Sequence, residues 1–176
     1  QEKFESLHQQ YMFFHHLFWH GVPEWLRKHR LYFKSEQRGF GEDAFHAMWY
    51  ELIKEFKPKS MFEIGVYRGQ VISAWALVAR ELDLTCEIHG ISPFTPAGDE
   101  VSTYISSIDY YEDVIENFKY FSLDLPNLHR GFSTDFEMIE VIKSRTWDFI
   151  YIDGSHDYDV VKSDFDNCSS VLSSGV

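Results

Sequence analysis

Residues 61–69 read MFEIGVYRG and residues 150–158 read IYIDGSHDY, and these two stretches decide the fold class. The first begins as a short apolar run, carries a carboxylate at Glu63 near its end, and then breaks at Gly65 and Gly69. Glycine reaches backbone conformations that other residues avoid, so the two glycines predict a tight turn. The run at 70–82 places apolar residues three and four apart, which is typical of a helix. We therefore predict a strand, a tight turn and the start of a helix.

The glycine turn predicts a ligand-binding crevice. In an open parallel sheet, ligands bind outside the carboxyl ends of the strands, where a helix start offers unpaired N–H groups. The dinucleotide fingerprint is Gly-x-Gly-x-x-Gly, which lets a pyrophosphate rest on the helix start. Here the turn reads Glu63-x-Gly65-x-Tyr67-x-Gly69, so the middle glycine is missing. An acidic residue at the strand end suits a ligand with an ammonium group better than it suits a pyrophosphate.

The second stretch predicts another strand that ends at a carboxylate. The run from Phe149 to Ile152 is fully apolar, Asp153 ends it, Gly154 allows a turn, and His156 follows. A carboxylate at such a strand end is costly unless it is paired or binds a metal ion. Histidine has the intrinsic pKa of a general base near neutral pH, and an aspartate oxygen is a ligand that Mg²⁺ accepts. His156 and Asp153 are therefore candidate catalytic residues, and the alternative for His156 is a hydrogen-bonded turn residue.

Composition and charge restrict the class of protein. The chain has 176 residues, of which 44% are hydrophobic and 18% aromatic, enough for one globular domain with its own core. The 16 basic and 28 acidic residues give a net charge of −12, which would repel a phosphate backbone, so we expect no nucleic-acid partner. We find no apolar run of about eighteen residues and expect no membrane partner. Cys86 and Cys168 form no disulfide framework, which favours a cytoplasmic location.

The two motifs in this order resemble class I S-adenosylmethionine-dependent methyltransferases. The variants EIGVYRG and IDGSHDY are most similar to the macrocin-type sugar O-methyltransferases and related small-molecule methyltransferases. The resemblance runs from Gly39 to the C-terminus. It implies an α/β, Rossmann-like, doubly wound and mostly parallel sheet with helices on both faces. It also implies S-adenosylmethionine as cofactor and a small polar acceptor, such as a sugar or a sugar-containing metabolite.

The resemblance also assigns roles to individual residues. Glu63, Gly65, Tyr67, Gly69 and Asp153 are expected to bind the cofactor. At the end of the strand predicted over 86–91, the family usually has an acidic residue that binds the ribose, but this chain has Ser92. A water or Asp99 would then compensate. Beyond a short strand at 128–130, the adenine would lie beside Phe132 and either Ser133 or Asp135. Alternatively, Ser133 or Thr134 only caps the helix predicted over 135–144.

The same resemblance implies a catalytic arrangement. His156 would act as general base, and Asp153 would help to hold a divalent cation such as Mg²⁺, together with an acidic pair after a fifth strand. Asp157 and Asp159 are expected in the first turn of the following helix, where acidic residues complement the helix dipole.

The segment before the glycine turn divides into two parts. We expect residues 1–40 to form an aromatic helical segment and residues 41–176 to form the cofactor-binding domain. The N-terminal segment would pack on the domain, contact a second subunit as a homo-oligomer, or cover the acceptor as a lid. Phe40, between two glycines, would either belong to a loop over the cofactor or staple the next helix to the core. The N-terminal segment is predicted to be an amphipathic helix from apolar residues at spacings near three and four: Phe4, Leu7, Tyr11, Phe14, Phe18 and Trp25.

The chain starts at Gln1 without methionine and stops at Val176, so we expect that it is cut from something longer and lacks the last strands of the sheet. Two other functions compete with methyl transfer. One is a nicotinamide-dependent oxidoreductase, which the missing middle glycine and Ser92 argue against. The other is a catalytically inactive cofactor-binding module, which Ser92 favours.

Overall fold

The computed structural model describes residues 6–35, 37–96 and 104–173. In this part of the chain, four parallel strands form one sheet in the order β3-β2-β1-β4. The strands are β1 (Ser60–Ile64), β2 (Glu87–Ser92), β3 (Asn127–Arg130) and β4 (Phe149–Ile152). The prediction of a parallel α/β sheet is therefore confirmed. β2 is displaced by one residue from the predicted range, so Ser92 is the last residue of the strand.

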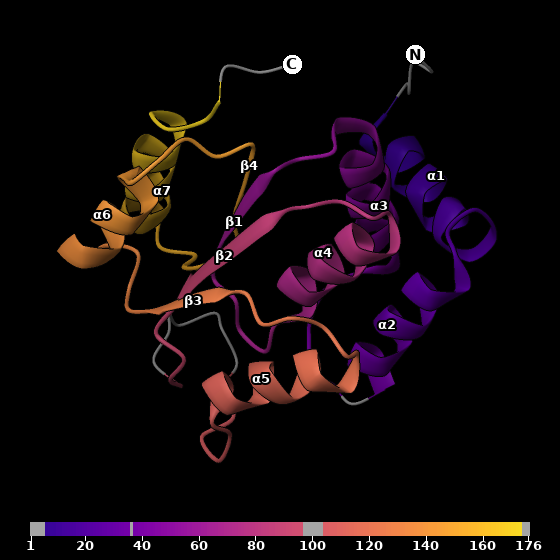
Figure 1. Cartoon of the computed structure of the whole chain (residues 1–176), viewed down its shortest axis with the longest axis horizontal. Coiled ribbons are helices and arrows are strands. Elements are labelled where there is room, and N and C mark those ends of the chain that lie inside the picture. Colours follow the sequence, from indigo (N-terminus) through magenta and orange to yellow (C-terminus); the bar gives the residue numbers. More distant parts are fainter. Residues whose placement is uncertain (1–5, 36, 97–103, 174–176) are drawn as a thin grey trace.

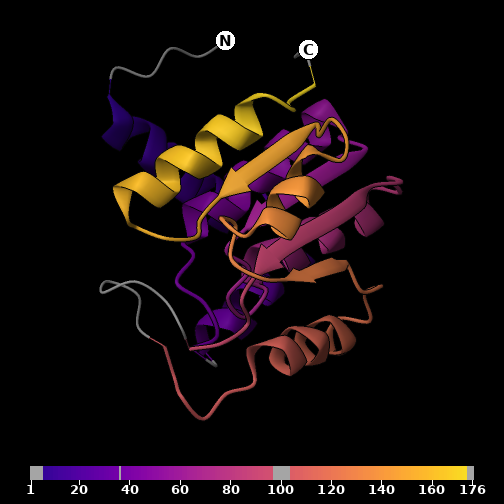
Figure 2. The same cartoon turned by 90° about the vertical axis from the view of Figure 1, so that its left-hand side faces the viewer.

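Helices cover both faces of this sheet. Figure 1 shows the strands between α3 and α4 on one side and α6 and α7 on the other, and Figure 2 shows α6 and α7 on the near side. The larger core joins the sheet to α3, α4 and α5 around Trp75, and the smaller core joins it to α6 and α7 around Trp147. The bounds of the helices are α1 Leu7–His20, α2 Glu24–Ser35, α3 Asp43–Phe56, α4 Gln70–Glu81, α5 Tyr110–Tyr120, α6 Phe136–Lys143 and α7 Tyr158–Ser169.

The central strand explains why the first motif is apolar. All of β1 is buried, because β2 and β4 flank it and helices lie above and below it. Glu63 is the one ionisable residue of this strand, and the register of the sheet pairs it with Gly90 of β2 and Tyr151 of β4. The register thus places one carboxylate inside the core, near the carboxyl ends of the strands.

The chain returns to the sheet after α7. Leu172 forms a parallel bridge with Trp147, just before β4 begins. The Trp147 amide donates to the Val171 carbonyl at 2.9 Å, and the Ser173 amide donates to the Trp147 carbonyl at 2.9 Å.

The N-terminal helices pack on α3 and α4, with α1 lying along α3. Of the apolar face predicted for α1, Phe18 is fully buried, while Leu7 is 84% exposed. Phe4 lies outside the described residues. Among the helices that the structure describes, none has the length and apolar character needed to cross a membrane.

Two buried histidines form a hydrogen-bonded chain that reaches the glycine turn. The Ser73 hydroxyl donates to the Gly69 carbonyl at 2.5 Å, so His29 Nε2, 2.9 Å from that hydroxyl, must be the donor to it. His29 Nδ1 is then an acceptor for His46 Nε2 at 3.3 Å. Both rings are neutral when His46 donates to His29 rather than to the Glu42 carbonyl, which lies 3.4 Å from His46 Nδ1 and can only accept. The chain of donors therefore runs from α3 through α2 to the first turn of α4.

We predict that acid destabilises the fold from about pH 6.5 downward, the ordinary pKa of histidine. Burial, reinforced by the neighbouring His46 and Arg30, holds the pKa of His29 well below its usual value. Burial and the charge of Arg30 lower the pKa of His46 to about 3. The unfolded chain gains protons on these two histidines below pH 6.5 and the folded chain does not. The stability linked to the two rings is therefore complete above that pH and falls as the pH falls.

Each histidine contributes up to ~1.4 kcal/mol per pH unit to this loss. Urea denaturation between pH 7.5 and pH 5 measures the slope. His8→Gln, at an exposed site, should keep the wild-type slope, whereas His46→Gln should reduce it. An unchanged unfolding free energy across this range would contradict two neutral buried rings.

Candidate cofactor crevice

The carboxyl ends of β1 and β4 form the point where the connections change sides. After β1 the chain passes to α4 on one face of the sheet, and after β4 it passes to α7 on the other face. Neighbouring parallel strands whose connections diverge in this way leave a crevice between the two loops. Glu63, Ser92 and Asp153 lie at the strand ends there, as the sequence predicts. The structure thus brings the two sequence motifs together.

Gly65 is required by the close approach of these two loops. Its φ is +97°, and a Cβ atom there would lie 2.1 Å from the carbonyl oxygen of Asp153. The Gly65 amide donates to the Ile91 carbonyl at 2.9 Å, and the Asp153 amide donates to the Ile64 carbonyl at 2.8 Å. The backbone is therefore fixed on both sides, and a side chain at this position would separate the strand ends.

The rest of the turn combines left-handed backbone with aromatic cover. Gly69 has φ +82° and precedes α4, and Tyr67 has φ +48°, which is unusual for a bulky residue. The ring of Phe40 lies 5.2 Å from the ring of Tyr67. Phe40 is 74% exposed, so the expectation that it staples the helix to the core is wrong. The Gly41 amide donates to Gln70 Oε1 at 3.1 Å, which holds this loop beside the start of α4.

Glu63 carries the main electrostatic conflict of the crevice. The side chain is 2% exposed; it accepts a hydrogen bond from the backbone of Ile72 in α4, and Oε2 has no partner among the described residues. Burial and the nearby carboxylate of Asp153 raise the pKa of Glu63 well above its usual value. An unpartnered buried carboxylate oxygen costs free energy until a donor reaches it. A ligand ammonium group would supply that donor, so this residue fits the expected cofactor.

Asp153 is more exposed than Glu63 and has two named neighbours. Desolvation at the sheet edge raises its pKa, while the hydrogen bond from the Tyr151 hydroxyl and the charge of His156 oppose that shift. Burial and the two carboxylates raise the pKa of Tyr151 well above its usual value. Tyr151 was not predicted from the sequence, although the alternation of β4 places it on the same face as Glu63.

The following helix starts as the sequence predicts. Asp157 caps α7 and accepts a hydrogen bond from the Asp159 amide at 2.9 Å. Asp157 and Asp159 therefore both have a structural role at the start of α7. His156 precedes this cap and is exposed.

The remaining predicted contacts lie on the β2 and β3 side of the crevice. Ser92 is 8% exposed, and its hydroxyl accepts a long hydrogen bond from the Phe94 amide at 3.5 Å. Asp99, the predicted substitute for an acidic residue there, lies outside the described residues. Phe132 is 49% exposed. Its amide donates to Asp135 Oδ2 at 2.8 Å.

The predicted helix cap after β3 is wrong. Asp135, not Ser133 or Thr134, stands at the N-cap position of α6. Ser133 instead lies beside the fully buried Asp164 of α7, where its hydroxyl favours the charged carboxylate. Burial nevertheless raises the pKa of Asp164. As placed here, Ser133 serves the contact between the β3–α6 turn and α7.

A metal site is incomplete in the described part of the chain. No three His, Cys, Asp or Glu side chains gather there in a way that could hold a metal ion. Asp153 supplies one carboxylate, whereas Mg²⁺ bound by protein needs further oxygen ligands or a bound phosphate. These residues alone do not fit the predicted cation.

Comparisons with known proteins agree with this geometry. A protein-family model described as a methyltransferase domain matches residues 62–176. The comparison with curated proteins gives no match. Among solved structures, an SAH-bound methyltransferase from Podospora anserina is similar, with 20% identity and a TM-score of 0.61; the alignment covers 88% of this chain and 60% of that chain.

Two bacterial structures are similar over more of their length. A putative caffeoyl-CoA O-methyltransferase from Staphylococcus aureus has 15% identity and a TM-score of 0.63, covering 96% of this chain and 69% of that one. An O-methyltransferase from Bacillus cereus in complex with SAH has 13% identity and a TM-score of 0.63, covering 96% and 71%. At these identities the likeness establishes the fold, and the chain spans about 60% of the Podospora protein.

We predict that Glu63→Gln raises the free energy of unfolding of the ligand-free protein at pH 8. The raised pKa means that the stability linked to this group is present below about pH 4.5, the ordinary glutamate value, and is lost as the pH rises through the folded pKa. Glutamine cannot ionise, so the gain should be roughly 1 kcal/mol or more and should shrink toward acid.

Denaturation of both proteins at pH 8 and pH 5 checks this. The exposed Glu116→Gln in α5 is the matched control and should change little at either pH. A Glu63→Gln protein that is less stable at both values would mean that the carboxylate is well accommodated.

Proposed function

Because this chain belongs to the family of methyltransferase domains, we propose that it transfers the methyl group of S-adenosylmethionine to a hydroxyl group. The observation that carries the proposal is the buried Glu63 with its unpartnered oxygen at the crevice between β1 and β4. The cofactor has an ammonium group that this oxygen can accept from. A nicotinamide dinucleotide would bring a pyrophosphate to the same carboxylate, which is unfavourable.

The proposed binding surface consists of the turn 65–69, Ser92 and the Phe132 ring. The turn brings the backbone close to the ligand, and α4 directs its first N–H groups there. Ser92 offers one uncharged oxygen to a ribose hydroxyl, where a carboxylate would accept from two. Phe132 offers stacking area for a planar base.

The proposed chemistry needs one proton acceptor. The bound sulfonium supplies an electrophilic methyl carbon with a thioether as leaving group. His156 takes the proton from the acceptor hydroxyl, whose oxygen then forms the new bond to carbon while the carbon–sulfur bond breaks. Asp153 lies within electrostatic reach of His156, so its carboxylate would attract the positive charge that the ring gains in that step.

The acceptor and partners follow from charge and surface. A net charge of −12 favours a small polar acceptor over a nucleic acid. We propose a sugar-type hydroxyl as this acceptor. The exposed apolar side chains of α1, including Phe13 and Trp19, would be covered in a homo-oligomer. The proposed reaction uses no Mg²⁺, because Asp153 is a single ligand in the described part of the chain.

Isothermal titration tests the cofactor. We expect S-adenosylmethionine to bind the wild-type protein and NADH not to bind. Glu63→Ala should remove the acceptor for the ammonium group. Gly69→Val should strain the backbone at a residue with φ +82°. Each substitution should weaken binding at least tenfold, or about 1.4 kcal/mol. Binding of NADH alone would replace methyl transfer by hydride transfer as the proposed chemistry.

His156→Ala tests the base. With a hydroxyl acceptor we expect turnover to fall by roughly two to four orders of magnitude, the usual range for a lost general base. The cofactor affinity should stay within about twofold, because the ring acts on the acceptor. His8→Ala is the control at an exposed histidine of α1. Normal turnover in His156→Ala would mean that His156 is a turn residue and not the base. Cofactor binding without any turnover in the wild type would favour a catalytically inactive binding module.

A further inference from the structure

A buried arginine–aspartate pair holds the glycine turn from outside the crevice. Arg68 stands between Tyr67 and Gly69, and its Nε donates to Asp113 Oδ2 at 2.6 Å. Its Nη2 donates to Asp113 Oδ1 at 3.1 Å. Arg68 is 7% exposed, and Asp113, in α5, is 8% exposed. Two parallel hydrogen bonds of this kind fix both the distance and the orientation of the paired groups.

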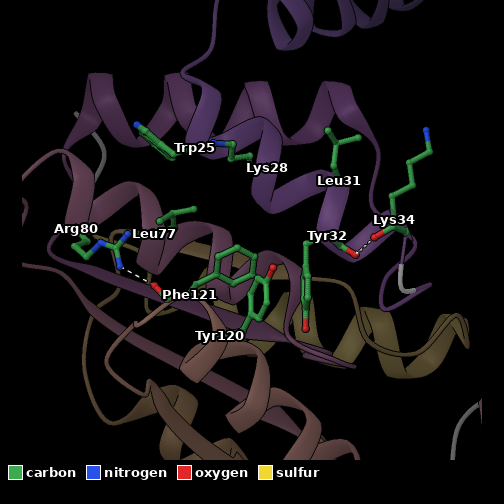
Figure 3. Close-up of a pocket in the computed structure, with 10 residues that line it drawn as sticks. Trp25, Lys28, Leu31, Tyr32, Lys34, Leu77, Arg80, Tyr120 and Phe121 are labelled. Atoms are coloured by element: carbon green, nitrogen blue, oxygen red, sulfur yellow. Dashed lines mark hydrogen bonds between the residues drawn. The ribbon is translucent and has the colours of Figure 1, made fainter.

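Asn117, one turn further along α5, holds the backbone of the same arginine. Its side-chain nitrogen donates to the Arg68 carbonyl at 2.9 Å, and its Oδ1 accepts from the Tyr32 hydroxyl at 2.8 Å. Tyr32 in turn stacks on Tyr120, with ring centroids 4.2 Å apart, in a groove of about 750 Å³ between α2, α4 and α5 (Figure 3). Helix α5 therefore holds Arg68 through its side chain and through its backbone.

The same carboxylate also holds the loop before α3. Arg38 Nη1 donates a hydrogen bond to Asp113 Oδ1, so a second guanidinium group contacts this carboxylate. Arg68 Nη1 donates to the Gln37 carbonyl at 3.4 Å. One aspartate of α5 thus joins the turn that faces the crevice and the loop that carries Phe40.

Stability alone does not account for this pair. Burying two charges costs desolvation energy that their attraction repays only in part, so such pairs add little to the free energy of folding. The backbone on both sides of Arg68 is left-handed, with φ +48° at Tyr67 and +82° at Gly69. Backbone of this kind persists where surrounding contacts over-determine it. The pair supplies such contacts from α5.

We infer that Arg68 and Asp113 are positioning residues, which keep the turn 65–69 in the conformation that receives S-adenosylmethionine. The inference rests on the proposed function. Neither side chain needs to touch the cofactor, because the effect passes through the backbone of the turn.

The test compares this pair with a second pair of the same burial. Arg30 Nε donates to Asp43 Oδ1 at 3.1 Å, and the two residues are 7% and 8% exposed. This pair joins α2 to α3, and no hydrogen bond of the described residues links either side chain to the turn 65–69. Asp43→Asn is therefore a matched control for Asp113→Asn, since each removes the charge from one buried aspartate.

We expect Asp113→Asn to raise the dissociation constant of S-adenosylmethionine at least tenfold, and Asp43→Asn to change it less than about threefold. Thermal denaturation should show a loss of stability in both, and a larger loss in Asp113→Asn, because Asp113 pairs with two arginines and Asp43 with Arg30. Arg68→Lys, which keeps the charge and loses the paired geometry, should weaken binding in the same direction. At saturating cofactor, turnover of the Asp113→Asn protein should recover to within about threefold of the wild type.

Hydrogen exchange supplies a readout that does not depend on the cofactor. Backbone amides of residues 65–70 should exchange faster in Asp113→Asn than in wild type, and at the wild-type rate in Asp43→Asn. Equal effects of the two aspartate substitutions, on affinity or on exchange in the turn, would overturn the positioning role. If the wild-type protein binds no S-adenosylmethionine but Asp113→Asn still speeds exchange in the turn, the proposed function is overturned. The restraint of the turn by this pair would then still hold.

Discussion

The structure depends on the contact between the ends of β1 and β4, where two backbones meet with no room for a side chain. A Cβ atom on Gly65 would lie 2.1 Å from the Asp153 carbonyl, so the two strand ends can be adjacent only with glycine there. This adjacency joins β4 to β1 while the connections leave on opposite faces of the sheet. The crevice is the geometric result of that divergence. The two sequence motifs are therefore two halves of one contact.

The crevice is also where the local rules for a stable core are broken. Glu63 stands in a fully buried strand, where an apolar residue would be expected. Its Oε2 has no partner among the described residues, and the carboxylate of Asp153 lies nearby. Tyr67 adopts a left-handed backbone that its side chain disfavours. Such violations concentrate where a protein binds or reacts, because the rest of the fold is stable enough to hold them. In this domain that reserve comes from the aromatic core around Trp75.

The sequence predicts the local features and misses the long-range ones. Strand β1, the turn and α4 follow from apolar spacing and two glycines, because those signals act between neighbours. The cap of α6 was misplaced, since Ser133 and Asp135 have similar preferences and only packing on Asp164 separates them. Phe40 could not be assigned, because exposure depends on which elements surround it. The Arg68–Asp113 pair joins residues 45 positions apart, and nothing in local spacing indicates it.

The buried histidine chain has a consequence for the electronic character of the helix start. The Gly69 carbonyl accepts from the Ser73 hydroxyl and also from the Ser73 amide, at 2.5 and 3.0 Å. His29 and His46 stand behind that hydroxyl as successive donors. Hydrogen bonds in series polarise one another, and the Gly69 carbonyl belongs to the same amide plane as the N–H of Gln70. Electron density drawn toward the oxygen leaves that N–H more acidic. The two buried histidine rings therefore make the Gln70 N–H, in the first turn of α4, a stronger hydrogen-bond donor.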